Sequence, residues 1–136
     1  MSGKVMMIGL DAGSLDFIEA SLSALPNLRR AIESGVRRRL RSRTTELLPA
    51  AAWPTLYTGT PPGAHGFYYP MQWDPNAMRL RHVRDWLYCE PFWYELERRG
   101  HRVVALDVPM TWPSRLQRGV EVTDWGAHDH LSALST

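Results

Sequence analysis

Asp11 is the first residue whose chemistry and position together suggest a function. It directly follows an uninterrupted apolar run, Val5–Leu10, and precedes the turn residues Ala12, Gly13 and Ser14. In open parallel sheets, ligands bind beyond the carboxyl ends of the strands, and a carboxylate there supplies the hard oxygen ligands that divalent cations prefer. Asp11 is therefore a candidate metal ligand. The alternative is that Asp11 caps the following turn or helix by accepting a backbone hydrogen bond.

The stretch from Leu47 to Gly66 is a second candidate. It combines three alanines at the expected start of a helix with a glycine stop at Gly59 and a His-Gly step at His65. Small residues at a helix start let backbone amides approach an anion such as phosphate, and the helix dipole favours negative charge there. A structural interpretation is also open, in which the alanines allow close packing, Gly59 ends the helix and His65 bonds to its own loop.

Two further segments carry residue types that bind metals or phosphates. One is a group of two acidic and two histidine side chains near the C-terminus: Asp124, His128, Asp129 and His130. These side chains could ligate a metal, although such groups near chain ends are commonly solvated. The other is the arginine-rich run 37–43, which could contact phosphates. For this run we favour an edge strand whose charges face water.

The elements that must position these residues follow an α/β pattern. Continuous hydrophobicity predicts a strand covered on both faces at Val5–Leu10, and shorter strands are expected at Val36–Arg43 and Val103–Leu106. Capping and stop signals predict helices at Leu15–Ala24 with Ser14 as N-cap, from Pro26 to before Gly35, around Trp53, and from Pro91 to Arg99. Repeated units of helix, glycine and strand favour a mainly parallel sheet flanked by helices.

The proline-rich segment Thr60–Arg79 separates these units. It holds four prolines and two glycines as well as several aromatic residues. We expect a long ordered loop lined with aromatic side chains, and a loop of that length in a compact domain is more often functional than idle.

The composition indicates a folded globular protein, and we expect residues 1–136 to form a single domain. Of the 136 residues, 44% are hydrophobic and 22% are charged, values typical of globular proteins. The net charge of +2 is too small for a dedicated nucleic-acid binder, and no apolar run approaches the roughly 20 residues that span a membrane. A single cysteine, Cys89, excludes an internal disulfide, and we expect a cytoplasmic protein.

Several short motifs also follow one another in a fixed order: Val5–Ala12, Leu25–Leu28, Gly35, Trp53–Gly59 and Pro62–Gly66. Together they resemble the N-terminal part of the alkaline phosphatase superfamily, in its type I phosphodiesterase and nucleotide pyrophosphatase branch. The later segments Val108–Pro113 and Gly119–Val122 are similar to continuations in the same group. The resemblance implies an alkaline-phosphatase-like α/β fold, present here as an incomplete N-terminal portion, because family members supply most of their metal ligands from segments beyond the position of Thr136.

The resemblance also implies a reaction. Members of the group are hydrolases with two divalent metals, commonly zinc, in which a Thr or Ser attacks phosphorus and forms a covalent intermediate. Two metals would stabilise the attacking and leaving oxygens and lower the pKa of the nucleophile. Asp11 matches the first metal-binding aspartate of the family by its position after the leading strand.

The expected nucleophile position is occupied by a residue that cannot attack. In the family, the Thr or Ser stands four residues before the position of Trp53, where this chain has Pro49, which carries no hydroxyl. Thr44 and Thr45 lie just upstream, and we take Thr45 as the candidate nucleophile. Thr55 and Thr58 fall within the expected helix and are interpreted as structural.

The expected function is therefore metal-dependent hydrolysis of a phosphate ester or phosphodiester, with a small-molecule substrate and without a nucleic-acid or membrane partner. The number of associated copies is left open, as is activity of so short a chain. The alternative is a non-catalytic binding domain or fragment that acts through an exposed sheet edge and the aromatic loop.

Overall fold

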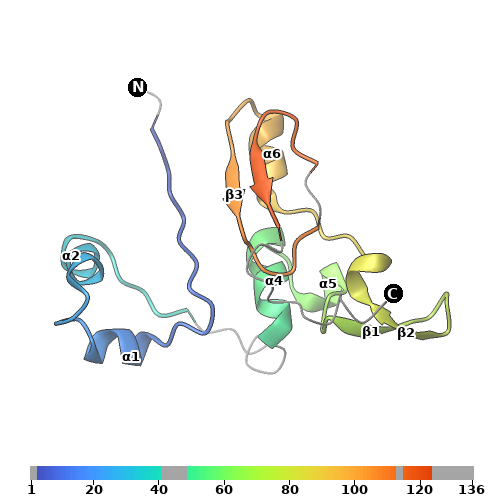
Figure 1. Ribbon diagram of the computed structural model, residues 1–136, viewed down its shortest axis with the longest axis horizontal. Coiled ribbons are helices and arrows are strands. Elements are labelled where there is room, and N and C mark those ends of the chain that lie inside the picture. Colours follow the sequence, from blue (N-terminus) through green and yellow to red (C-terminus); the bar gives the residue numbers. More distant parts are fainter. Residues whose placement is uncertain (1–2, 41–48, 113–114, 124–136) are drawn as a thin grey trace. The chain divides into compact units, whose positions relative to one another are not determined.

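The computed structural model describes residues 3–40, 49–112 and 115–123. The chain divides into two compact units, Met1–Arg41 and Ser42–Thr136, and the single-domain expectation stays a prediction. The first unit holds α1 (Leu15–Ala20) and α2 (Pro26–Ser34), drawn in blue in Figure 1. The second holds, in order, η1 (Pro49–Ala51), α4 (Ala52–Thr58), α5 (Pro62–His65), β1 (Met71–Asp74), β2 (Arg79–His82), η2 (Val83–Asp85), α6 (Phe92–Arg98), β3 (Val104–Leu106) and β4 (Val120–Val122).

The two helices of the first unit are specified by local signals. The Ser14 side chain accepts a hydrogen bond from the Phe17 N–H at 3.4 Å, which confirms Ser14 as the N-cap of α1. The predicted helix from Pro26 to before Gly35 is also confirmed. Helix α1 ends at Ala20 rather than Ala24. The Ser21 N–H donates to both the Phe17 and the Ile18 carbonyls, a shared hydrogen bond that is common at helix ends.

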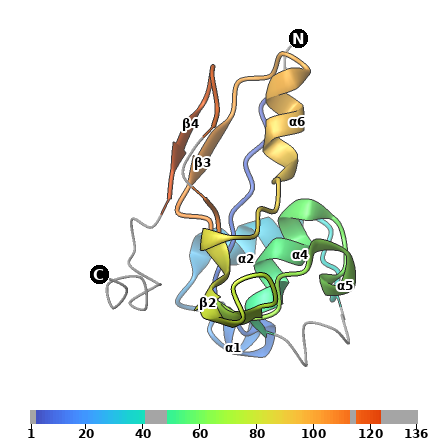
Figure 2. The same ribbon diagram turned by 90° about the vertical axis from the view of Figure 1, so that its right-hand side faces the viewer.

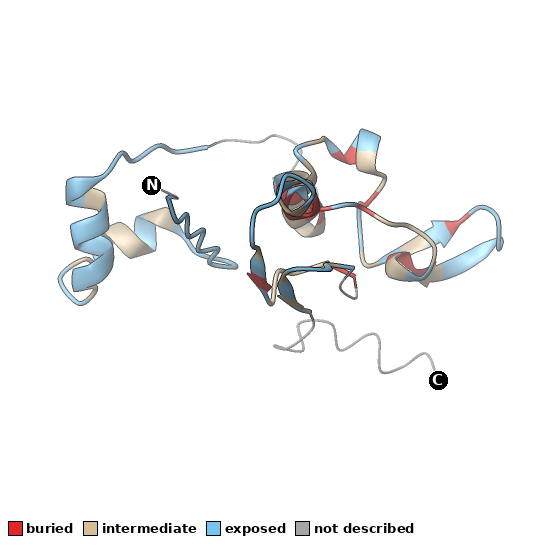
Figure 3. Cartoon of the chain, turned by 90° about the horizontal axis from the view of Figure 1, so that it is seen from above, coloured by how far each residue is buried: buried red, intermediate tan, exposed pale blue. Residues whose placement is uncertain are grey.

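The prediction of two strands in the first unit is wrong for the described residues of that unit. Residues 5–10 and 36–40 form no strand, and Val5 and Val36 are 96% and 85% exposed. An apolar run forms a strand only where another strand takes its backbone hydrogen bonds, and the described residues of this unit contain none. Figure 3 shows that none of the described residues of this unit is buried.

Helices α4 and α5 are each ended by a glycine in the left-handed region. Gly59 has φ of 67° and donates its N–H to the Thr55 carbonyl at 3.0 Å, which confirms the predicted helix stop. Gly66 ends α5 in the same way with φ of 76°. Only a residue without a Cβ adopts this conformation at little cost, so each glycine turns the chain sharply out of its helix.

The segment expected to be a long loop instead contains α5 and an antiparallel hairpin. Strand β1 pairs with β2 in a register that places Trp73 opposite Leu80. The loop expectation is wrong because Pro70 and Pro75 flank β1 rather than interrupt it. Buried Asp74 fixes the turn that follows by accepting hydrogen bonds from the Asn76 and Ala77 N–H groups and from Arg81.

Helix α6 packs beside a parallel pair of strands, as Figure 2 shows. Pro91 precedes the helix, and β3 lies within the predicted strand Val103–Leu106, so both predictions are confirmed. Strand β3 pairs with β4 in parallel, with Ala105 opposite Glu121. The described strands thus form one parallel pair and one antiparallel pair. The protein is α/β, but a mainly parallel sheet is not confirmed.

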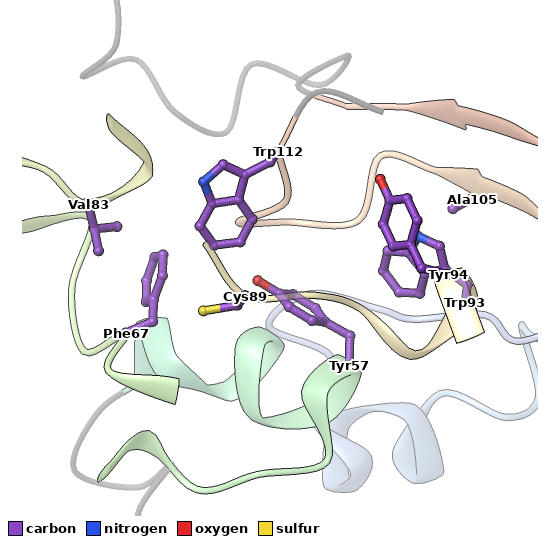
Figure 4. Close-up of a cluster of buried hydrophobic side chains, with 8 residues drawn as sticks. All are labelled: Tyr57, Phe67, Val83, Cys89, Trp93, Tyr94, Ala105 and Trp112. Carbon is purple, nitrogen blue, oxygen red and sulfur yellow. The ribbon is translucent and has the colours of Figure 1, made fainter. Parts of the chain in front are cut away.

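The core of the second unit is built mostly from aromatic side chains. Tyr57 meets Trp93 edge to face at a centroid distance of 5.7 Å, and Phe67 meets Trp112 at 6.3 Å. Such pairs add about 1 kcal/mol beyond the burial of their area. Figure 4 shows the full set, contributed by segments far apart in sequence: Tyr57, Phe67, Val83, Cys89, Trp93, Tyr94, Ala105 and Trp112.

Candidate functional site

Asp11 lies in an exposed turn of the first unit. The Gly13 N–H donates to the Leu10 carbonyl at 3.2 Å and closes the turn that contains Asp11. The N-cap of α1 is Ser14, so Asp11 does not serve as the cap of that helix. Its neighbour Ala12 has φ of 51°, a left-handed conformation that costs a residue with a Cβ about 1 kcal/mol. The turn therefore presents an acidic residue at the surface, next to a strained one.

Other predicted site residues fall outside the described part of the chain. These are Thr45 and its neighbour Thr44, together with the C-terminal group Asp124, His128, Asp129 and His130. Within residues 3–40, 49–112 and 115–123, no three His, Cys, Asp or Glu side chains gather closely enough to hold a metal ion. The described residues thus supply Asp11 as a single candidate ligand rather than a complete metal site.

The arginine-rich run makes ion pairs within its own unit. Arg37 pairs with Glu19 and Arg39 pairs with Asp16, both acidic residues of α1. The Arg37 and Arg39 side chains are about half exposed, and ion pairs of this kind contribute little to stability. The edge strand expected for this run is absent between residues 36 and 40. Residues 41–43 are not among the residues that the structure describes.

In the second unit, α4 and α5 meet through a threonine and a histidine. Thr55 Oγ1 lies 3.1 Å from His65 Nε2. The Phe67 N–H donates to His65 Nδ1 at 3.0 Å, because Gly66 turns the backbone back over the ring. The expectation that His65 bonds to its own loop is therefore confirmed. The Cys89 thiol donates to the carbonyl oxygen of His65 at 3.5 Å, so a third segment also reaches this residue.

The direction of these hydrogen bonds determines what His65 can do. A backbone N–H can only donate, so Nδ1 is the acceptor and carries no proton. In the neutral ring the proton then resides on Nε2, which donates to Thr55 Oγ1. A nitrogen that already holds a proton cannot take one from the threonine hydroxyl. The pair therefore does not activate Thr55 as a nucleophile, in agreement with a structural role for this residue.

Cys89 is likewise unsuited to nucleophilic chemistry. Its side chain is buried, and burial raises the pKa of the thiol to about 11. The reactive form of cysteine is the thiolate, which is scarce at neutral pH when the pKa is raised in this way. Cys89 acts in the core as a small apolar residue with a weak S–H donor.

Polar contacts between distant residues, which no sequence motif predicts, organise this unit. Glu121 accepts hydrogen bonds from Trp93 Nε1 at 3.0 Å and from the Tyr94 hydroxyl at 2.6 Å, tying β4 to α6. Tyr94 in turn accepts the Arg115 N–H at 3.0 Å. Burial and the Glu121 hydrogen bond raise the pKa of Tyr94 to about 12. Glu121 lies 28 residues from Trp93 and 27 residues from Tyr94 in the sequence. Local sequence patterns do not predict contacts over such separations.

The comparison with known families gives the class of protein. The family model described as type I phosphodiesterase / nucleotide pyrophosphatase matches residues 5–132, almost the whole chain. The chain therefore belongs to this hydrolase family, which confirms the resemblance found in its motifs. Neither the curated proteins nor the solved structures gave a match. Among the described residues, no helix has the length and apolar character needed to cross a membrane.

Proposed function

We propose that the protein is a metal-dependent hydrolase of phosphate esters or phosphodiesters, with Asp11 as a ligand of a divalent metal, zinc, and Thr45 as the nucleophile. The observation that carries the proposal is the family match over residues 5–132, which includes both of these positions. A small phosphate ester as the substrate and a cytoplasmic location are parts of the same proposal.

The turn at Asp11 supports the proposed metal-binding role. Asp11 is exposed, so a cation in solution can reach this residue. The left-handed Ala12 beside it is a strained residue, and such residues concentrate at functional sites. Carboxylate oxygen is also among the ligands that zinc accepts in hydrolytic enzymes.

The chemistry assigns separate tasks to the two residues. The Thr45 hydroxyl would lose its proton and attack phosphorus, the P–O bond to the leaving alcohol would break, and water would then hydrolyse the covalent intermediate to release the phosphate and restore the threonine. A bound divalent ion supplies Lewis-acid stabilisation of the attacking oxygen. Asp11 would hold such an ion through a carboxylate oxygen. A site for two metals needs several ligands around each ion, and no group of three potential ligands gathers among the described residues.

Turnover of bis-p-nitrophenyl phosphate by the purified chain with zinc or manganese tests the metal role. We expect Asp11→Ala to abolish turnover, because it removes a proposed ligand. Asp16→Ala is the matched control, since Asp16 is another exposed acidic residue of the same unit and pairs with Arg39. Turnover that survives Asp11→Ala would contradict this mechanism.

The same assay separates the two candidate threonines. We expect Thr45→Ala to remove turnover and Thr45→Ser to keep part of it, because serine also carries a hydroxyl. Thr44→Ala serves as the neighbouring control. Loss of turnover in Thr44→Ala with normal turnover in Thr45→Ala would move the nucleophile to Thr44.

A non-catalytic binding domain is the second candidate function, and one observation favours it. Four apolar residues of the parallel pair are exposed, Val104, Leu106, Val120 and Val122, although parallel strands are ordinarily covered on both faces. Calorimetric titration with zinc separates the candidates. Stoichiometric binding that Asp11→Ala removes supports the hydrolase, and its absence supports the binding domain.

A further inference from the structure

His65 joins three segments of the second unit through three different atoms. Its Nε2 reaches Thr55 of α4, its Nδ1 receives the Phe67 N–H, and its carbonyl oxygen accepts from Cys89. Both ring nitrogens and the backbone oxygen are thus engaged. A surface histidine without a structural task would leave at least one ring nitrogen to water.

We infer that His65 is a positioning residue, which in its neutral form clamps α4 to the turn after α5 and which releases α4 when it is protonated. The inference rests on the proposed function, because η1 and α4 follow directly after the segment that contains Thr45. Helix α4 and η1 are the described elements nearest to Thr45 in the sequence. A shift of about 1 Å in such an element is enough to lower a catalytic rate roughly 100-fold.

The donor pattern around the ring explains why protonation opens the clamp. The neutral ring donates at Nε2 and accepts at Nδ1, which suits the Thr55 hydroxyl and the Phe67 N–H. The protonated ring donates at both nitrogens. The Phe67 N–H would then face another donor, so the ring or the backbone must move. Either movement breaks the geometry that holds Thr55.

Few charged groups lie on the elements around His65 to oppose this effect. Tyr57 is the titratable residue of α4, and its hydroxyl donates to the Met110 carbonyl. The buried Cys89 thiol stays neutral because its pKa is raised. Glu90, which follows Cys89, is paired with an arginine of α6. None of these three groups therefore supplies an unpaired charge to the imidazole.

Strand β1 and the segment after β2 complete these surroundings. Gln72 of β1 donates to the Gly66 carbonyl, and Asp74 of the same strand is paired with Arg81. Arg84 and Asp85 belong to η2, ahead of the segment that holds Leu87 near Gly66.

The sign of the pH effect follows from burial. Partial burial lowers the pKa of His65 below its ordinary value, because desolvation penalises the charged ring. The clamp is therefore intact above about pH 6.5, the pKa of an unperturbed histidine. Its contribution to stability is lost as the pH falls through the lower pKa of the folded state.

Nuclear magnetic resonance of the ¹⁵N-labelled full chain tests the clamp directly. At about pH 8 we expect His65 with a proton on Nε2 and none on Nδ1, and we expect it to become doubly protonated as the pH falls below that at which an ordinary histidine titrates. The protection factors of the α4 amides, which correct exchange rates for their intrinsic pH dependence, should then fall roughly 3- to 10-fold, as expected for the loss of one hydrogen bond. A proton on Nδ1 at high pH would overturn the inference, and so would protection factors in α4 that do not change when His65 titrates.

Two variants and one control separate the clamp from general stability. Thr55→Val keeps the shape of the side chain and removes the acceptor, so α4 should exchange roughly 3- to 10-fold faster at high pH as well. His65→Gln keeps an amide donor that does not titrate, so the protection factors of the α4 amides should become independent of pH. Thr58→Val is the control on the same helix, because Thr58 bonds to the Pro54 carbonyl and to Thr60 rather than to His65. It should leave the His65 tautomer and its titration unchanged.

Activity measurements distinguish failure of the clamp from failure of the hydrolase proposal. If the wild-type chain turns over bis-p-nitrophenyl phosphate, we expect Thr55→Val to lower kcat about 10-fold or more with little change in KM. We also expect His65→Gln to remove the acid limb of the pH profile. Normal kcat in Thr55→Val would overturn the positioning role and leave the hydrolase intact. Absence of wild-type turnover with zinc or manganese would count against the hydrolase, while the tautomer and exchange measurements would still decide the clamp.

Discussion

Different kinds of contact stabilise the two units of this protein internally. In Met1–Arg41 the helices rest on a serine cap, a proline start and exposed ion pairs, and none of the described residues is buried. In Ser42–Thr136 the elements surround an aromatic core, and buried polar groups such as Asp74 have specific partners. The comparison teaches that local signals suffice to place a helix, whereas contacts between distant segments are needed to make a stable unit.

The energies of the two kinds of contact differ by several-fold. An exposed ion pair such as Arg37 with Glu19 contributes about 0–1 kcal/mol. Complete burial of one large apolar side chain contributes about 1.5–3 kcal/mol. We therefore expect the second unit to carry most of the stability, and substitutions matched between the units test this expectation.

The largest difference is expected between a core aromatic residue and an exposed one. Trp112 is buried against Phe67 and Tyr88 and donates to the Arg84 carbonyl. Trp112→Ala should lower the free energy of unfolding by about 3–5 kcal/mol, because it leaves a large cavity. Phe17→Ala in α1, where the side chain is 71% exposed, should change it by less than about 0.5 kcal/mol. Urea unfolding followed by far-ultraviolet circular dichroism measures both, and equal losses would refute the distinction between the units.

A smaller difference is expected between two glutamates. Glu121→Ala leaves the indole N–H of Trp93 and the hydroxyl of Tyr94 without their acceptor, which should cost about 2 kcal/mol. Glu19→Ala breaks only the exposed pair with Arg37 and should cost about 0.5 kcal/mol or less. The same urea measurement applies. Glu121→Gln keeps an oxygen acceptor and should lie between the wild-type chain and Glu121→Ala.

The smallest effect is expected for the cap of α1. Ser14→Ala removes the acceptor for the Phe17 N–H and should destabilise that helix by about 1 kcal/mol. Because a six-residue helix has little stability of its own, we expect loss of helical ¹³Cα shifts in α1 without a change in unfolding of the second unit. Ser21→Ala is the control, since Ser21 contributes its backbone N–H at the other end. A concerted loss of both units would show that they are coupled.

Much of the local structure could be predicted, because it depends on neighbouring residues. The Ser14 cap, the start of α2 at Pro26 and the stop at Gly59 follow from side chains and backbone preferences within one turn. The hairpin was missed because four prolines suggested a loop. Two of them, Pro70 and Pro75, in fact mark the ends of β1, and Asp74 builds the turn between the strands.

The candidate site was predictable only where a motif carries it. The family was identified from ordered motifs that include Asp11, and the family match confirms that identification. The Thr55–His65 contact could not be foreseen, because nothing in a separation of ten residues indicates that the chain turns back at Gly66. The direction of that hydrogen bond follows only from a second contact. The Phe67 N–H donates to Nδ1, so the proton of the neutral ring lies on Nε2.

The sequence by itself determined the family, the α/β class and the helices whose ends are marked by serine, proline or glycine. Each of these depends on residue type and short-range order, which a single chain displays directly. Only the tertiary structure decided that Val5–Leu10 lies exposed without forming a strand, that Thr55 accepts a hydrogen bond from His65 rather than donating one, and that Glu121 joins β4 to α6. These outcomes depend on which distant groups meet, because a strand needs a partner and a buried donor needs an acceptor.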